Sequence, residues 1–129
     1  MFSYEVGILK SADRLQHASA QVDALAREFD EIAAPHVHEL VRLKETEAML
    51  LAARMILGAS LMRTESRLSH FREDHEQRDD QNWLAWVDIG ERNGDFNFER
   101  TPIPTPLCSV EPVRRPTRLR KQHAVGGVE

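Results

Sequence analysis

A chain of 129 residues, 41% hydrophobic and 29% charged, is long enough for one domain at most and has the composition of a soluble protein. Its formal net charge of −4 is unevenly spread: residues 1–112 hold 12 Lys and Arg against 20 Asp and Glu, whereas residues 113–129 hold 5 against 1. Cys108 is the single cysteine, which excludes an intramolecular disulfide and is typical of a reducing compartment. The first residues lack the basic and apolar regions of a signal peptide, so we expect a cytoplasmic protein.

Hydrophobic periodicity predicts a first helix from about Ala12 to Ala33. Ser11 is a suitable N-cap, and Pro35 ends the helix because the residue before a proline is driven out of the α region. The apolar residues that recur at steps of three and four, and so form one stripe, are Leu15, Ala18, Val22, Leu25, Phe29 and Ile32. This stripe can cover one side of another helix.

A second helix is predicted from about His36 to Arg67, and its composition is different. Between Ala48 and Met62 the apolar residues cover nearly the whole circumference, and such a helix must be contacted from more than one side. The C-terminal part of the chain or another protein surface must therefore supply the second contact. The same run has 15 residues and contains Arg54, so it is too short to span a bilayer, and we expect no membrane insertion.

The charged segment from His70 to Asp80 has no apolar periodicity and is predicted to be an ordered loop or short turns. Two short alternating runs then flank Asn93-Gly94, which is the strongest short-range signal for a β-hairpin. From Thr101 onward the chain is rich in proline and arginine, which predicts an extended arm followed by a disordered tail.

The predicted fold is therefore mainly α. Two long antiparallel helices, of the helical-bundle kind, are followed by a charged loop, a small β-hairpin and an extended C-terminal arm. Residues 1–104 form the domain, and residues 105–129 form the tail.

Residues 65–83 are the most informative segment, because they crowd both charge signs and histidine directly after an apolar helix. They resemble the motif E-S-R-G-x-H-x-R-x-D-x-P-x-R-D-D-x-x-W near the C-terminus of the flavoprotein subunits of succinate dehydrogenase and fumarate reductase. Related versions occur in the adenylylsulfate reductase alpha subunit and in L-aspartate oxidase. Ten specified positions match: Glu65, Ser66, Arg67, His70, Arg72, Asp74, Arg78, Asp79, Asp80 and Trp83. Two depart, since Leu68 replaces a glycine and Glu76 replaces a proline.

The resemblance covers about residues 4–104 and implies a C-terminal helical domain of such a flavoprotein. In this family the residues that bind substrate and flavin lie upstream of this domain, in the FAD and capping domains. The resemblance therefore implies a structural and docking role, with FAD held by a partner domain or chain and with an iron–sulfur subunit as a possible further partner. Independently, the chain lacks a G-x-G-x-x-G segment, so we expect it to bind no FAD and to be no enzyme on its own.

Two interpretations of the charged segment follow from the residues themselves. In one, His70 carries protons and Arg67 or Arg72 clamps a carboxylate, since the planar guanidinium fork suits dicarboxylates. In the other, the ten matched residues form a network of ion pairs that fixes the end of the second helix and an interface. The family resemblance favours the network.

Other functions are weighed against the same sequence. His36-x-His38 and His70-x₄-His75 lack the tight spacing of metal motifs, so we expect no metal site. The basic segment 114–121 lacks aromatic residues for base stacking and follows an acidic body, so we expect no nucleic-acid partner. Trp83 and Trp86 are expected to anchor the core. A different class of protein remains open, namely a free-standing helical interaction module that buries its second helix by forming a homodimer.

Overall fold

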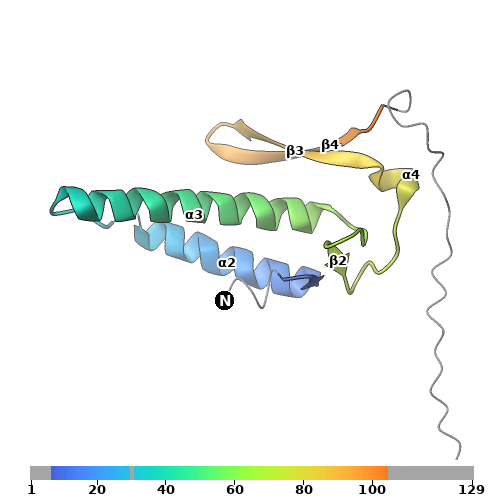
Figure 1. Ribbon diagram of the computed structural model, residues 1–129, viewed down its shortest axis with the longest axis horizontal. Helices are drawn as coiled ribbons and strands as arrows, with labels where there is room; N and C mark the ends of the chain where they lie inside the picture. The colour runs from blue at the N-terminus through green and yellow to red at the C-terminus, as the bar shows by residue number, and fades with distance from the viewer. Residues whose placement is uncertain (1–6, 30, 105–129) are drawn as a thin grey trace, which may run out of the picture.

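The computed structural model describes residues 7–29 and 31–104. The predicted Pro/Arg-rich tail over residues 105–129 lies outside these residues. The elements in chain order are β1 (Leu9–Lys10), α2 (Ala12–Phe29), α3 (Val37–Met62), β2 (Phe71–Arg72), α4 (Asp80–Trp83), β3 (Ala85–Arg92) and β4 (Asp95–Pro102). Figure 1 shows α3 between α2 on one side and the β3–β4 hairpin on the other. Two long packed helices followed by a small antiparallel hairpin confirm the predicted fold class.

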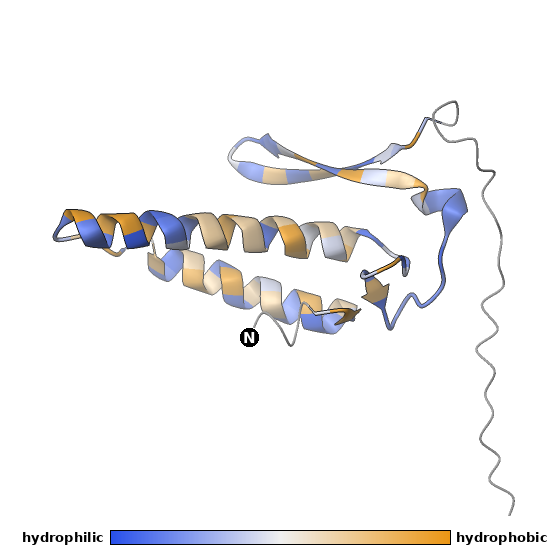
Figure 2. Ribbon diagram, in the orientation of Figure 1, coloured by the Kyte–Doolittle hydropathy of each residue, from blue (hydrophilic) through white to orange (hydrophobic). Residues whose placement is uncertain are grey.

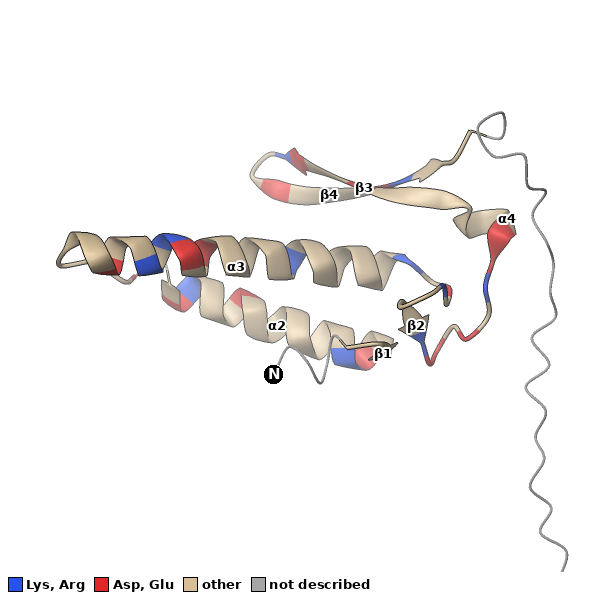
Figure 3. Cartoon of the chain, in the orientation of Figure 1, with Lys and Arg blue, Asp and Glu red and all other residues tan. Residues whose placement is uncertain are grey.

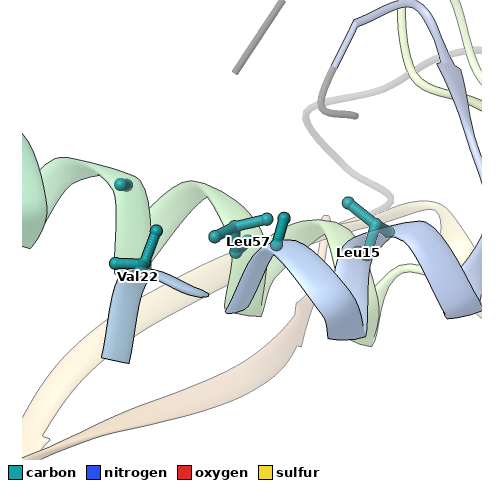
Figure 4. Close-up of a cluster of buried hydrophobic side chains, with 5 residues drawn as sticks. Leu15, Val22 and Leu57 are labelled. Atoms are coloured by element: carbon teal, nitrogen blue, oxygen red, sulfur yellow. The ribbon is translucent and has the colours of Figure 1, made fainter. Parts of the chain in front are cut away.

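The core lies between α2 and α3 and is small (Figure 4). Leu15, Ala18 and Val22 of α2 are buried against Ala53 and Leu57 of α3. These α2 residues occupy the first half of the predicted stripe, where steps of three and four keep side chains on one face. Complete burial of a leucine contributes about 1.5–3 kcal/mol, so Leu15 and Leu57 are central to the stability of the helix pair.

Both helices are shorter at their C-terminal ends than the sequence predicts. α2 ends at Phe29 rather than near Ala33, and Leu25 and Ile32 of the predicted stripe are exposed. Because Leu25 and Ile32 are exposed, further helical turns in this direction would bury little apolar surface. α3 ends at Met62 rather than at Arg67, because Arg63 adopts an extended conformation and the chain turns away.

The second side of α3 is covered in part by the hairpin. The ring of Phe98 in β4 lies directly against Gly58, so closely that a Cβ atom added there would be 2.1 Å from the ring. Arg54 pairs with Asp23 of α2 at 3.3 Å and lies 5.6 Å from the centre of the Phe96 ring. The C-terminal part of the chain therefore supplies a second contact to α3, which is one of the two alternatives expected from the sequence. The hairpin nevertheless leaves much of α3 exposed. Figure 2 shows apolar residues along α3, including the half that the hairpin does not reach.

The hairpin turn follows the sequence closely. Asn93 and Gly94 have φ values of 56° and 84°, and they join the facing residues Arg92 and Asp95. Asparagine and glycine tolerate these left-handed conformations, which match the twist of the strands. The hairpin is longer than its two alternating runs predict, with eight residues in each strand.

The charged loop contains more regular structure than predicted. β2 pairs in parallel with β1, with Leu9 facing Phe71 and Lys10 facing Arg72. This pair ties the entry to α2 to the exit from α3. α4 follows as a single turn that Asp79 caps by accepting a hydrogen bond from the Asn82 backbone at 3.1 Å.

The prediction that Trp86 anchors the core is wrong. Trp83 is buried, as predicted, whereas Trp86 is half exposed. Trp86 follows the buried Ala85 in β3, and successive side chains of a strand point to opposite faces. Among the described residues, neither long helix has the length and hydrophobicity needed to cross a bilayer.

Candidate functional site

The ten motif residues gather at one end of the helix pair, between the end of α3 and the start of α2. Figure 3 shows charged residues of both signs along the chain that links β2 to α4. Two charged groups are buried at the centre of this region, the guanidinium of Arg72 and the carboxylate of Glu65. The rest of the network is organised around these two groups.

Arg72 closes the C-terminal end of α3. Its Nη1 atom donates to the carbonyl oxygens of Ser60 at 2.8 Å, Arg63 at 3.2 Å and Leu61 at 3.3 Å. The last carbonyls of a helix have no partners within the helix and carry partial negative charge, so a buried cation there satisfies both needs. This contact stops α3 at Met62 and explains why a helix predicted to reach Arg67 ends early.

Asp74 links the same arginine to the start of α2. It accepts two hydrogen bonds from Arg72, at 2.8 Å from Nε and 2.6 Å from Nη2, and a third at 3.1 Å from the backbone N–H of Ala12. Arg72 holds the pKa of Asp74 well below its usual range. The Asp74 carboxylate at the N-terminus of α2 and the Arg72 guanidinium at the C-terminus of α3 each interact favourably with a helix dipole. One ion pair therefore joins both helix ends. Arg14 and Glu73 form a second, more exposed ion pair beside it.

Glu65 is the other centre and is 0% exposed. Its Oε1 accepts from Arg63 and from Arg67, both at 2.7 Å, and its Oε2 accepts from Arg67 at 3.0 Å and from the backbone N–H of Asp79 at 2.9 Å. Hydrogen bonding to Glu65 raises the pKa of Arg67. Four donors around one carboxylate remove the cost of burying an unpaired charge.

Asp80 extends this cluster toward the surface. Its Oδ1 accepts from Arg67 at 2.6 Å and from Arg78 at 2.7 Å, and the hydrogen bond from Arg78 is the main cause of its lowered pKa. Its Oδ2 is buried without a protein donor in the described part of the chain. Asp79 also has a lowered pKa, because the side chain of Asn82 donates to it.

Ser66 and His70 fix the path of the backbone between the two centres. The Ser66 hydroxyl accepts from the Arg72 N–H at 2.8 Å and donates to the carbonyl oxygen of His75 at 2.8 Å. His70 Nε2 lies 3.2 Å from the Arg63 carbonyl oxygen, which places a donor there. Burial lowers the pKa of His70, and the nearby cations of Lys10, Arg72 and Arg63 act in the same direction.

The turn that carries His70 includes a strained residue. Arg67 and His70 exchange two backbone hydrogen bonds, at 2.8 and 3.0 Å, so Leu68 and Ser69 form the tip. Leu68 has a φ of 53° and is 97% exposed. This left-handed conformation is natural for glycine, the residue that the family motif has here, and costs leucine about 1–2 kcal/mol.

Trp83 joins the network to the hairpin. Its indole N–H donates to the Thr64 hydroxyl at 3.1 Å, and the guanidinium carbons of Arg63 and Arg100 lie 5.1 and 5.7 Å from its ring centre. Arg63 also donates to the Ala85 carbonyl oxygen at 2.7 Å. Trp83 is therefore a buried anchor between α3 and β3 rather than a stacking surface for a cofactor.

The structure brings all ten predicted site residues together. Sequence reasoning missed four contributors that lie outside the motif: Arg63, Thr64, Lys10 and Arg100. A basic residue at the C-terminal end of a helix is a known signal, and the position of Arg63 as the C-cap of α3 could have identified it. Lys10 and Arg100 lie far from the motif in sequence and carry no local signal.

The arrangement is suited to holding chain segments together. The motif arginines donate to motif carboxylates or to helix carbonyls. An open pocket of about 220 Å³ lies beside the Leu68 turn, and its lining includes Arg63, His70, Trp83 and Ile103. In the described residues, histidine, cysteine and acidic side chains form no group of three that could hold a metal ion. His70 contacts the Arg63 carbonyl, whereas His75 lies 3.9 Å from Asp74, so the two histidines serve different partners.

Comparison with known proteins identifies the domain. Residues 1–117 match the model of the fumarate reductase flavoprotein C-terminal family. The chain belongs to this family. L-aspartate oxidase of Streptomyces coelicolor, one relative of this flavoprotein C-terminal domain, is 32% identical over 117 residues, which cover 85% of the chain and 20% of that protein. The family is FAD-dependent.

Solved structures have the same fold as this flavoprotein C-terminal domain. A mutant Escherichia coli quinol fumarate reductase matches with a TM-score of 0.73 and 21% identity over 79% of the chain and 19% of the matched protein. Adenylylsulfate reductase from Archaeoglobus fulgidus matches with a TM-score of 0.69 and 24% identity over 74% of the chain and 16% of its own. The chain thus spans about a fifth or less of the length of these relatives. The resemblance inferred from residues 65–83 is confirmed.

Proposed function

We propose that the chain is the C-terminal docking domain of a succinate dehydrogenase/fumarate reductase-type FAD-dependent oxidoreductase. It packs against the FAD and capping domains, on a partner chain or in the same protein, and supplies no catalytic group. The observation that carries this proposal is the use of the motif charges: Glu65, Arg67, Arg72 and Asp74 are engaged with one another and with helix ends.

Exposed apolar side chains next to the network support docking at this end of the molecule. Ile8 and Leu9 are more than half exposed, and they lie at the start of β1, shortly before the N-terminus of α2 that the network holds. Leu68 projects from the neighbouring turn. We call these three residues the docking end. Apolar groups that surround a rigid polar frame are typical of a surface that another domain covers.

FAD belongs to the partner in this proposal. An isoalloxazine and pyrophosphate need a glycine-rich strand-to-helix turn, and the sequence contains no such fingerprint. The reaction supported by the assembled protein is a two-electron oxidation or reduction of a small acid, and an iron–sulfur subunit is a further candidate partner. The docking domain acts in the cytoplasm.

Copurification tests the proposal. The chain is coexpressed with a flavoprotein of this family from which the C-terminal domain has been deleted, and the two are separated from free chains by gel filtration. We expect a one-to-one complex that carries flavin, whereas the chain alone is colourless. Replacing Leu68 and Leu9 with serine should weaken the complex, and serine at Ile89 on the hairpin is the matched control. Stoichiometric flavin on the chain alone would contradict the proposal, as would a complex insensitive to the docking end.

A further inference from the structure

A second apolar surface lies on α3, away from the docking end. Val37, Val41 and Leu51 are each about half exposed or more. From Val37 onward, alternating steps of four and three residues lead to Val41, Lys44, Ala48, Leu51 and Met55. We call these six residues the α3 seam. Its spacing is the 3.5-residue repeat with which one helix packs along another in a coiled coil.

The α3 seam cannot be covered by α2. At 100° per residue it lies nearly opposite Ala53 and Leu57, which face α2. The hairpin reaches only its C-terminal limit, because Gly58, the next residue at the same spacing, lies beneath the ring of Phe98. The free seam therefore runs from Val37 to Met55, about 28 Å at 1.5 Å per residue.

We infer that two copies of the chain pack through the α3 seam in an antiparallel arrangement. In the register that places Val41 opposite Leu51 of the second copy, Lys44 lies opposite Ala48 of that copy. Alanine leaves room for the lysine stem, and the ammonium group extends past the seam. It then comes within reach of Glu47 of the second copy, which directly precedes Ala48 in sequence.

The charges of the seam select this orientation. Lys44 is exposed and pairs within its own helix with Glu47 at 2.6 Å, so both groups are already on this surface. A parallel arrangement in register would place Lys44 directly against Lys44 of the second copy. A polar residue at a seam position is a known determinant of orientation and register. The second copy is thus favoured by charge complementarity as well as by apolar spacing.

Sedimentation equilibrium of the full 129-residue chain tests the inference. We expect a dimer at tens of micromolar concentration. Leu51→Glu should raise the dissociation constant at least about 100-fold, because the seam would bury an unpaired carboxylate. Met49→Glu is the matched control: Met49 is 64% exposed on the same helix but lies outside the seam, so this variant should remain dimeric. A wild-type monomer, or a dimer that Leu51→Glu leaves intact, would overturn the inference.

Disulfide cross-linking tests the orientation. In a Cys108→Ser background, chains with Val41→Cys and chains with Leu51→Cys are mixed and oxidised. The antiparallel register predicts a mixed Val41→Cys to Leu51→Cys product and little product between two Val41→Cys chains. The reverse distribution would overturn the antiparallel register. Circular dichroism of each variant verifies that the helices are retained.

These experiments are independent of the proposed function. Flavoprotein binding is read from flavin in the copurified complex and depends on the docking end. Self-association is read from the chain alone and depends on the α3 seam. Failure of one therefore leaves the other standing, and a Leu51→Glu chain that is monomeric but still binds the flavoprotein would separate the two surfaces directly.

Discussion

Leu68 is a single residue whose backbone conformation does not suit its side chain. It is left-handed at φ 53° and makes the tip of a turn whose ends are fixed by two backbone hydrogen bonds. Leu68→Gly should raise the free energy of unfolding by about 0.5–1 kcal/mol, because relief of strain exceeds the added chain entropy of glycine. Urea denaturation measures the change. Ser69 does not have a positive φ, so Ser69→Gly is the control and should give no gain.

Arg72 combines burial with contacts to two helix ends. Arg72→Met would remove the guanidinium that pairs with Asp74 and donates to the last carbonyls of α3, and breaking a buried pair in this way costs about 3–5 kcal/mol. The control is Arg14→Met, which removes the more exposed pair with Glu73 and should cost under about 1 kcal/mol. Thermal unfolding of both variants compares the two. Equal losses would mean that burial does not distinguish these ion pairs.

His70 gives the domain a dependence on pH in the mildly acidic range. Burial lowers its pKa in the folded protein below the value of about 6.5 expected in the unfolded chain. As the pH falls below about 6.5, the unfolded chain binds the proton first, so the free energy of unfolding falls and then levels off below the folded pKa. His70→Gln, which keeps a donor toward the Arg63 carbonyl, should lose this part of the dependence. The control is His17→Gln, which replaces an exposed histidine and should keep this pH dependence of the free energy of unfolding.

At the scale of elements, the contact between the hairpin and α3 depends on the absence of a side chain at Gly58. Gly58→Ala would place a Cβ atom inside the present position of the Phe98 ring. We expect the helices to remain and the hairpin to be displaced, so amide hydrogen exchange should rise in β3 and β4 but not in α2. Replacing Phe98 with Leu in the same chain should restore part of the protection. Unchanged exchange in Gly58→Ala would show that the ring moves without cost to the hairpin.

The elements differ in how far the sequence determines them. Helix periodicity and Asn93-Gly94 are local signals, so both long helices and the hairpin turn could be predicted. The end of α3 could not, because it is set by Arg72, which follows the helix and returns to its carbonyls. The β1–β2 pair joins Leu9 to Phe71 through strands of two residues, which are too short to carry a pattern.

The candidate site has the same division. Its members could be predicted because the motif is contiguous in sequence. Their partners could not, since the fold rather than the spacing decides that Arg67 binds Glu65 and Asp80 while Arg72 binds Asp74. The exposure of Trp86 could not be predicted for the same reason, because only the folded structure decides which face of β3 points toward α3.

At the scale of the whole molecule, the polar network and the apolar surfaces have complementary roles. The network holds α2, α3 and the hairpin in one arrangement through buried pairs, although the apolar core between the helices is small. This arrangement leaves the docking end and the α3 seam pointing outward on different parts of the surface. A domain that is rigid before it binds loses less conformational entropy on assembly.

Arg67 then distinguishes a supporting network from a catalytic one. Its side chain is 22% exposed and pairs with the fully buried Glu65, so Arg67→Ala should cost about 3–5 kcal/mol of stability or reduce assembly with the flavoprotein accordingly. Arg78→Ala is the control, because Arg78 is 58% exposed and Asp80 keeps its other partner; the expected loss is under about 1 kcal/mol. In the fraction of Arg67→Ala complex that assembles, turnover per bound flavin should stay near that of the wild type. Loss of a general acid or base typically lowers the rate about 10²–10⁴-fold. A complex that forms normally but turns over about 100-fold more slowly would therefore assign a catalytic role to this cluster.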